Sequence, residues 1–503
     1  MDYPLAILSG VLLALSFPKF GQPALAWIAL VPLLAALGSA KRIQVQRAFG
    51  LGLATGIVAF AGTLYWISGV MMTYGGLTWP TALAVNALLV SYLAIFVGLF
   101  AVMVTYYDGT STSVTVGIVT TSAAWVVSEF GRGYLFGGFP WELLGYSQVE
   151  VLPVAQLASV FGVYGISFLI VLVNGALASI AVRADRQRLI TGGVVLGIAV
   201  LIAGWGQWRL SQNTLVNEGE PVRVAAIQGN VAQDKKHDPG FRTSILDTYL
   251  SASRSAAADG AKLLIWPESA LPLPFNEDVG AAVAIRDLAK ETGSHILFGS
   301  EEFEETGNFH YYNAAFHISP TGINGPTYRK IHLVPFGEYV PFRRLLFFAD
   351  KLVSSVPDFS PGTEAVTFSM DGHRFSSAIC YEVVYPSLAR SAVSAGSELL
   401  TTITNDAWFG RTSAPHQHFS QAAMRAIEQG RYLVRAANTG ISGVVDPYGR
   451  VLAQAELFEN ARVVADVRWI NAKTVYGWTG DLFVYLCLML VLCVLVIGVR
   501  ASR

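Results

Sequence analysis

VRVAAIQGN (222–230), FRTSILDTYLSASRSAAADG (241–260) and AKLLIWPES (261–269) follow one another in the middle of this chain. The first and third are short runs of aliphatic residues, a pattern typical of buried strands. The second has apolar residues at helical spacing and ends at Gly260, a common helix stop. Alternating strands and helices indicate a layered α/β domain in which helices cover a sheet.

The same alternation continues along the middle of the chain. Further helices are predicted at 279–293, 385–396 and 418–438, and further strands at 294–303, 312–320, 373–382, 397–410 and 441–454. DPYG (446–449) predicts a hairpin turn within the last of these strand regions.

The composition indicates a membrane protein. Of 503 residues, 53% are hydrophobic and only 14% are charged, whereas soluble domains carry about 25% charged residues. A helix needs about 20 apolar residues to cross a bilayer. The chain offers eight candidate spans, at 3–18, 23–39, 49–72, 80–106, 113–130, 160–182, 189–208 and 480–499.

We therefore expect a multi-domain chain. It consists of a helical membrane bundle with seven spans (1–212), a globular domain (213–475) and a C-terminal membrane helix (476–503). We do not expect the first span to be a signal peptide, because Met1 and Asp2 bring no basic charge and further spans follow directly. A net charge of −1 without a basic stripe argues against nucleic-acid binding.

Lysine and arginine are concentrated in alternate short loops, which predicts the orientation of the chain. With a cytoplasmic N-terminus, the globular domain lies outside the cytoplasm. The inside loops then hold Lys41, Arg42, Arg47, Arg183, Arg186, Arg188, Arg500 and Arg503, and the short outside loops hold only Lys19 and Arg132.

The globular domain contains one cysteine, Cys380, in SAICYEVVYP (377–386). A single cysteine forms no internal disulfide, so Cys380 is either a small core residue or a nucleophile. Glu268, Cys380 and Asn405 each end a predicted strand. If those strands are parallel, all three lie at one edge of the sheets, where α/β domains bind ligands.

A thiol nucleophile needs a base or a nearby cation. Glu268 is a candidate base, and Lys330 could stabilise an oxyanion, with Glu338 orienting either one. Taken alone, Glu268 and Lys330 each fit a surface charge better. A histidine base is the rival, from His332 or from His416 and His418. No cluster has the ligand spacing of a zinc site, so no metal is expected.

Three motifs in order carry a resemblance. WPES (266–269), YRKIHLVPFGEYVP (328–341) and ICYEVVYP (379–386), with NDAWFG (405–410) after them, resemble the Glu-Lys-Cys signature of the nitrilase (carbon–nitrogen hydrolase) superfamily. With its flanking spans, the whole chain resembles the apolipoprotein N-acyltransferase family. The resemblance implies an αββα sandwich joined to a membrane bundle.

By position, the resemblance implies that Glu268 is the general base, Lys330 the oxyanion-stabilising lysine and Cys380 the acylated nucleophile. His237 stands where the family often has tryptophan, so no role is assigned to it. Supporting roles in catalysis or substrate binding are expected for Glu338, Tyr381, Glu382, Asn313 and Trp266.

The activity implied is transfer of a fatty acyl chain from a phospholipid, through a Cys380 thioester, to the amine of a diacylglyceryl-cysteine apolipoprotein. The resemblance implies a monomer without a cofactor in the bacterial inner membrane, with the catalytic domain on the periplasmic side. FGRGYLFGGFPWELLGYSQ (130–148) and FRRLLFFADKLV (342–353) are aromatic segments suited to lipid contact, although the second could equally be a core helix.

Two other functions are considered. A membrane-anchored amidase or nitrilase-type hydrolase would need only one span. A transporter would carry ionisable residues within its spans, yet Glu129, near an outer end, is the main such residue here.

Overall fold

In the computed structural model, residues 2–38, 44–108, 113–236, 238–271, 274–306, 308–339 and 358–501 are described. The chain divides into two compact units. One contains residues 1–73, 77–212 and 478–503, and the other contains residues 74–76 and 213–477. His237 and the predicted amphipathic segment 342–353 lie outside the described residues.

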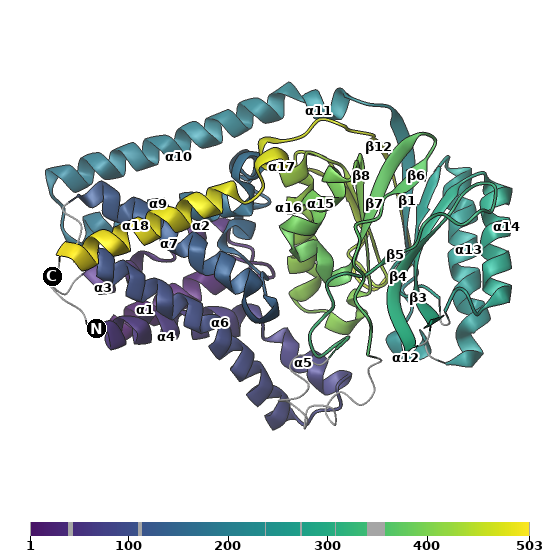
Figure 1. The fold of residues 1–503 in the computed structure, drawn as a ribbon, viewed down its shortest axis with the longest axis horizontal. Coiled ribbons are helices and arrows are strands. Elements are labelled where there is room, and N and C mark those ends of the chain that lie inside the picture. Colours follow the sequence, from purple (N-terminus) through teal and green to yellow (C-terminus); the bar gives the residue numbers. More distant parts are fainter. Residues whose placement is uncertain are drawn as a thin grey trace. The chain divides into compact units, whose positions relative to one another are not determined.

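The first unit is helical (Figure 1). Its helices are α1 (Asp2–Leu15), α2 (Pro23–Ala26), α3 (Val31–Gly38), α4 (Val45–Thr63), α5 (Trp66–Thr73), α6 (Trp79–Asp108), α7 (Val114–Tyr134), α8 (Leu152–Ala155), α9 (Ala158–Val182), α10 (Arg186–Gln212) and α18 (Leu482–Ala501). Within the described ranges, five helices are long and apolar enough to cross a membrane, and three shorter apolar helices accompany them. The count of eight spans stays a prediction.

The predicted span 49–72 is interrupted. α4 ends at Thr63 and α5 begins at Trp66, so this region contains two helices rather than one.

Two charged residues of α7 hold the glycine-rich segment that follows it. The Arg132 guanidinium donates to the carbonyl oxygens of Phe139, Trp141 and Glu142 at 2.8–3.3 Å. Glu129 accepts from the Leu144 amide at 2.6 Å. The first part of 130–148 is exposed at Tyr134, Leu135 and Phe136, whereas Trp141 and Tyr146 are buried. Only the first part therefore has the exposure expected of a lipid-contacting loop.

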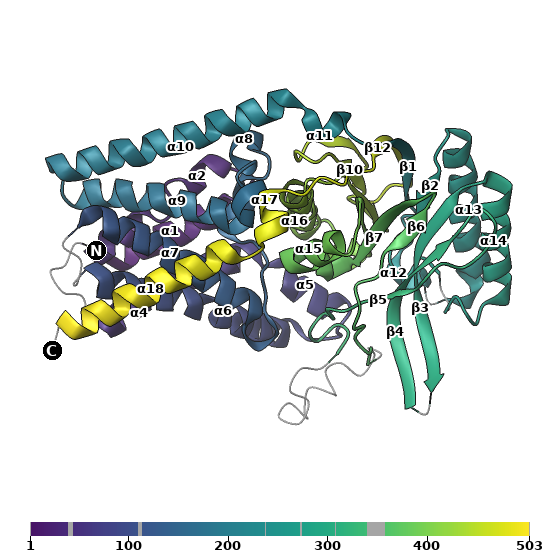
Figure 2. The ribbon, with the colours of Figure 1, turned by 45° about the horizontal axis from the view of Figure 1, so that its top comes forward.

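The second unit has four layers, helix–sheet–sheet–helix (Figures 1 and 2). One sheet has the order β12-β1-β2-β3-β4-β5, and the other has the order β11-β10-β9-β8-β7-β6. The first sheet contains β1 (Pro221–Gln228), β2 (Leu263–Ile265), β3 (His295–Thr306), β4 (Asn308–Ile318), β5 (Tyr328–Arg329) and β12 (Ala461–Arg468). The second contains β6 (Phe368–Met370), β7 (His373–Ile379), β8 (Leu399–Thr404), β9 (Leu433–Ala437), β10 (Gly443–Val445) and β11 (Val451–Gln454).

Alternate residues of each strand enter different cores, as the period of two requires. Leu263 and Ile265 of β2 pack between the two sheets. Leu264, and Trp266 just after the strand, instead pack under α13 (Arg242–Ala258) and α14 (Val279–Thr292). On the other side, α15 (Pro386–Ser394) and α16 (Ala414–Gln429) cover the second sheet (Figure 1). The predicted αββα arrangement is confirmed.

The predicted helix over 418–438 is wrong in its second half. α16 ends at Gln429, the capping Gly430 adopts a left-handed conformation (φ 62°), and residues 433–437 form β9 in the centre of the second sheet. Leu, Val and Ala in this segment suit either state, so burial between β8 and β10 decides the outcome. The strands β5, β6 and β12 were not predicted.

Each sheet contains three neighbouring parallel strands, whose carboxyl ends lie at the same edge of that sheet. β1, β2 and β3 are parallel, as are β7, β8 and β9. The chain leaves β2 toward Glu268, β7 into Cys380 and β8 into Asn405. Cys380 and Asn405 thus follow neighbouring parallel strands of the second sheet, and the Asn405 amide donates to Glu268, which follows β2 of the first sheet.

Candidate active site

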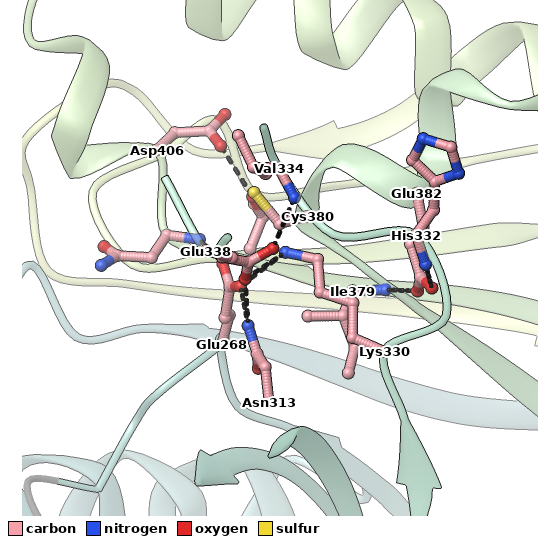
Figure 3. Close-up of polar contacts among 12 residues, drawn as sticks. Glu268, Asn313, Lys330, His332, Val334, Glu338, Ile379, Cys380, Glu382 and Asp406 are labelled. Atoms are coloured by element: carbon pink, nitrogen blue, oxygen red, sulfur yellow. Dashed lines mark hydrogen bonds and ion pairs between the residues drawn. The ribbon is translucent and has the colours of Figure 1, made fainter. Parts of the chain in front are cut away.

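The site is a buried group of charged side chains at the strand ends (Figure 3). Glu268 is at its centre. Its Oε1 accepts from Asn313 Nδ2 at 2.7 Å and from Lys330 Nζ at 3.3 Å. Its Oε2 accepts from the Asn405 backbone amide at 2.9 Å. Both sheets therefore hold this one carboxylate.

A glycine allows Glu268 to reach this position. Gly299 of β3 lies so close to the Glu268 backbone that a Cβ at Gly299 would stand 2.6 Å from the Glu268 Cα. The Gly299 amide also donates to the Pro267 carbonyl at 3.1 Å. Close backbone approach is one of the few roles that only glycine fills.

Lys330 follows β5 and is 1% exposed. Its ammonium donates to Glu338 Oε1 at 2.8 Å as well as to Glu268. Asn313 of β4 bridges the same two carboxylates, because its Nδ2 also donates to Glu338 Oε1 at 2.9 Å. Glu338 in turn accepts from the Val334 amide at 2.8 Å. These four residues form one connected network.

Cys380 begins a 3₁₀ turn, Cys380–Val384, directly after β7. Its φ of 52° is in the left-handed region, which is unusual for a residue other than glycine and is found at functional sites. Figure 3 shows the Cys380 sulfur beside the group that contains Glu268, Lys330 and Glu338, and the charges of Glu268 and Lys330 both act on the thiol. The sharp turn therefore presents the thiol to the network.

Electrostatics keep the carboxylate charged and the thiol neutral. Burial opposes the charge on Glu268, but Lys330, Asn313, Lys236 and the Asn405 amide outweigh it and lower the pKa of Glu268. For Cys380, burial raises the pKa, the Glu268 charge raises it further, and Lys330 opposes the change. At neutral pH the resting pair is therefore a carboxylate and a thiol.

Lys330 stays charged. Burial disfavours its ammonium, but Glu338 and Glu268 more than compensate and raise the pKa of Lys330. A fixed ammonium next to the thiol is positioned to stabilise negative charge that develops on a bound carbonyl oxygen.

Glu382 joins the segments that carry Lys330 and Cys380. Its Oε1 accepts from the amides of Ile331 at 2.6 Å and His332 at 3.1 Å. Its Oε2 accepts from the Ile379 amide at 2.8 Å. The Tyr328 hydroxyl contacts both oxygens, at 2.8 and 2.9 Å. We call these contacts the Glu382 clip.

Tyr381 and Trp266 are the remaining candidates from the sequence, and neither side chain belongs to the network around Glu268. The Tyr381 ring lies against His332 and Tyr385, with centroids 6.0 and 5.4 Å apart. Trp266 is not among the polar groups. Its indole N–H donates to Ser253 at 2.9 Å and its ring stacks on Tyr249, in the core beneath the outer helices.

The histidine rival has a different geometry from a Cys–His pair. His418 Nε2 lies 3.1 Å from the backbone carbonyl oxygen of Cys380, so it is the protonated nitrogen and donates there. Nδ1 lies 3.1 Å from Asp406 Oδ1 and 3.0 Å from Arg435 Nη2, and Arg435 also pairs with Asp406 at 2.6 Å. His418 therefore supports the Cys380 turn through its backbone.

One residue of the site was missed from the sequence. Lys236, at the end of α12 (Gln233–Lys236), is buried and donates from Nζ to the Glu268 carbonyl oxygen at 3.3 Å. Its place beyond the carboxyl end of a predicted strand was the available signal. Within the described ranges, no group of His, Cys, Asp and Glu residues is suited to hold a metal ion.

Comparison with known proteins matches both parts of the chain. Residues 9–176 match the family described as apolipoprotein N-acyltransferase N-terminal domain, and residues 223–473 match the carbon–nitrogen hydrolase family. A Geobacter metallireducens protein named apolipoprotein N-acyltransferase is 43% identical over 97% of this chain and 93% of its own length. A Methylococcus capsulatus protein of the same name is 35% identical, over 95% and 92%.

A solved amidase from Nesterenkonia sp. aligns with 52% of this chain and 95% of its own, at 23% identity and a TM-score of 0.39.

Proposed function

Because the chain belongs to the apolipoprotein N-acyltransferase family, we propose that it carries the transferred acyl group as a thioester on Cys380. Glu268 acts as the base and Lys330 stabilises the oxyanion, with Asn313 and Glu338 holding both in place. The observation that supports this most directly is the buried network that holds Glu268 and Lys330 next to the thiol on its left-handed turn.

In the first half-reaction, Glu268 takes the thiol proton as the sulfur attacks the ester carbonyl carbon of the donor. The negative charge that forms on the carbonyl oxygen is stabilised by the Lys330 ammonium. Collapse of this intermediate breaks the bond to the glycerol oxygen, which receives the proton from Glu268. The products are the thioester and a lysophospholipid.

In the second half-reaction, the neutral amine of the acceptor attacks the thioester. The C–S bond breaks, the amide forms, and the amine proton passes through Glu268 to the Cys380 sulfur. The amine enters as its conjugate acid at neutral pH, so one further proton leaves to solvent. Dividing the transfer in this way replaces one difficult step by two easier ones.

The donor is a phospholipid and the acceptor a diacylglyceryl-cysteine lipoprotein. The five long apolar helices support a membrane setting, and the names of the relatives support a lipoprotein acceptor. The excess of lysine and arginine in the inside loops supports a periplasmic position for the catalytic domain in the inner membrane. We propose a monomer, because each of the proposed catalytic groups comes from one chain.

A membrane-anchored hydrolase is the alternative from the same superfamily. The relatives that match over nearly the whole chain are named acyltransferases, so a specific observation in favour of a hydrolase is lacking. The two functions differ in the acceptor, which is an amine in one and water in the other.

The test is to incubate the full chain with a phospholipid that bears an alkyne-tagged acyl chain. We expect a tagged adduct on Cys380 that neutral hydroxylamine removes. Cys380→Ala and Glu268→Gln should abolish it, whereas Cys487→Ala and Cys493→Ala, matched thiols of the C-terminal helix, should retain it. A chain labelled elsewhere, or not at all, contradicts the proposal.

A second step separates transferase from hydrolase. Addition of a diacylated lipopeptide with a free N-terminal amine should move the tag to that peptide as an amide. Release of the tagged fatty acid at the same rate with and without the lipopeptide would support the hydrolase.

A further inference from the structure

A second buried lysine lies next to the base. Lys236 is 3% exposed and its Nζ contacts the Glu268 backbone carbonyl at 3.3 Å. Glu268 is thereby contacted on its backbone by one lysine and on its carboxylate by another.

The two lysines differ in their partners. Lys330 forms ion pairs with Glu338 at 2.8 Å and Glu268 at 3.3 Å. Lys236 forms no ion pair with a described residue, and a backbone carbonyl is its one described acceptor. Burial accordingly lowers the pKa of Lys236 to about 8, against the opposing charges of Glu268 and Glu301. Burying an ammonium without an ion pair is costly, so this residue is not explained by stability.

The segment that carries Lys236 is fastened to the second sheet. Gln233 accepts from Asn405 Nδ2 at 2.8 Å, and Asn405 Oδ1 accepts from Asn438 at 2.9 Å. Asn438 also bonds both backbone groups of Val231, at 2.8 and 3.0 Å. The same Asn405 donates its backbone N–H to Glu268. These amide contacts fix the start of α12 relative to the carboxylate.

We propose that Lys236 is a positioning residue for Glu268, holding the backbone of the base in place and keeping its carboxylate ionised next to Cys380. This inference rests on the proposed function, in which Glu268 takes the proton of the thiol. It adds a residue whose charge acts on the base rather than on the substrate.

The charged and titratable groups that face Glu268 come from several elements. Lys330 follows β5, Cys380 follows β7 and Lys236 ends α12, while Asn313 and the Asn405 amide contribute dipoles. Glu301 of β3 is the other carboxylate whose charge reaches Lys236. Removing the Lys236 charge leaves Glu268 with one lysine, so its carboxylate should protonate at a higher pH.

The experiment measures the single-turnover rate of Cys380 acylation by tagged phospholipid as a function of pH, in the full chain. With Lys236→Met, we expect the acid limb of the profile to move upward by about one pH unit, the low end of the effect of an opposite charge nearby. Lys236→Arg should keep the limb within a few tenths of a unit of its original position. Lys235→Met, at the exposed neighbour in α12, is the matched control and should leave the profile unchanged.

The outcomes are distinguishable. A merely structural role predicts that Lys236→Met and Lys236→Arg lower the rate equally at all pH values, and that result overturns the inference. An unchanged profile in Lys236→Met overturns it as well. If Lys236→Met does not fold, Lys236→Gln, which removes the charge but keeps a donor, provides the same comparison. Failure of the wild-type chain to form any Cys380 adduct would instead overturn the proposed function.

Discussion

Replacing Glu382 by glutamine should weaken both the fold and the site. The carboxylate of the Glu382 clip accepts from three backbone amides and one hydroxyl in a fully buried position. In Glu382→Gln, the amide oxygen can keep the Ile331 and His332 contacts. The amide nitrogen then faces the Ile379 N–H, which is also a donor, and that bond is lost.

The magnitude follows from the bonds that change. A hydrogen bond to a charged group contributes about 1.5–3 kcal/mol, and a buried donor left without an acceptor costs about 1–3 kcal/mol. The retained amide contacts also lose their charge assistance. We expect the free energy of unfolding to fall by about 3 kcal/mol.

The acylation rate should fall for a geometric reason. Ile379 precedes Cys380, and the left-handed turn of Cys380 persists only while its surroundings hold it. A displacement of about 1 Å at a reacting atom reduces the rate by roughly 100-fold. Tyr328→Phe removes one hydroxyl but keeps every amide contact, so its rate should fall only a few-fold.

The assay is single-turnover acylation of Cys380, paired with thermal unfolding of the same samples. Glu398→Gln is the matched control, because Glu398 is buried and accepts from His373 and the Arg374 amide, with no bond to the site. It should lose stability but keep its rate. If Glu382→Gln loses stability and acylates at the wild-type rate, the clip does not position the thiol, and this reasoning is refuted.

Other perturbations test the rest of the site. Glu338→Gln removes the negative charge that pairs with Lys330 at 2.8 Å and should lower the acylation rate about 10- to 100-fold, measured in the same assay at unchanged substrate binding. Gly299→Ala brings a Cβ within 2.6 Å of the Glu268 Cα, so we expect about 1–3 kcal/mol of destabilisation by thermal unfolding and a much slower acylation. The pKa of Glu268 is lowered from 4.5, so the acylation rate should stay level as pH falls to 4.5 and should decline only below that pH. A decline that begins near pH 6.5 would instead implicate a histidine base. Burial and a neighbouring histidine lower the pKa of His317 to about 3, so the unfolded state binds a proton below pH 6.5 that the folded state does not. The free energy of unfolding should therefore decrease as the pH is lowered, by about 2 kcal/mol at pH 5. His317→Phe should make the melting temperature depend less on pH.

The alternating pattern in the sequence was sufficient to predict most of the globular domain, because its strands and helices have different hydrophobic periods. It did not predict β9, whose Leu433–Ala437 segment continues a helical composition past Gly430 and becomes a strand only by insertion between β8 and β10. Edge strands such as β6, with three residues, carry too few side chains for a period to be recognised.

For the site, the strand ends placed Cys380 and Asn405 together because β7 and β8 are parallel neighbours, and the packing of the two sheets brings Glu268 to them. Lys330 and Glu338 were candidates from their charge, and the resemblance then implied their roles, since their segment has no regular period that would place them. Trp266 shows that closeness in sequence to a site residue does not place a side chain in the site. It lies two residues from Glu268, but its side chain continues the alternation of β2 and packs with Leu264 under the outer helices, whereas Glu268 comes after Pro267, beyond the end of the strand. Lys236 was missed because a lysine in a short polar helix is normally exposed, and only the fold shows that it is buried.

The division of the site between two sheets has a consequence for biosynthesis. Glu268 and Lys330 belong to the first sheet, and the thiol belongs to the second. The last strand of the first sheet to be translated, β12, pairs with the first strand, β1, after every strand of the second sheet has been made. A chain that ends before residue 461 therefore lacks β12 and leaves β1 as an unpaired edge of the first sheet, although every residue of the site has already been made.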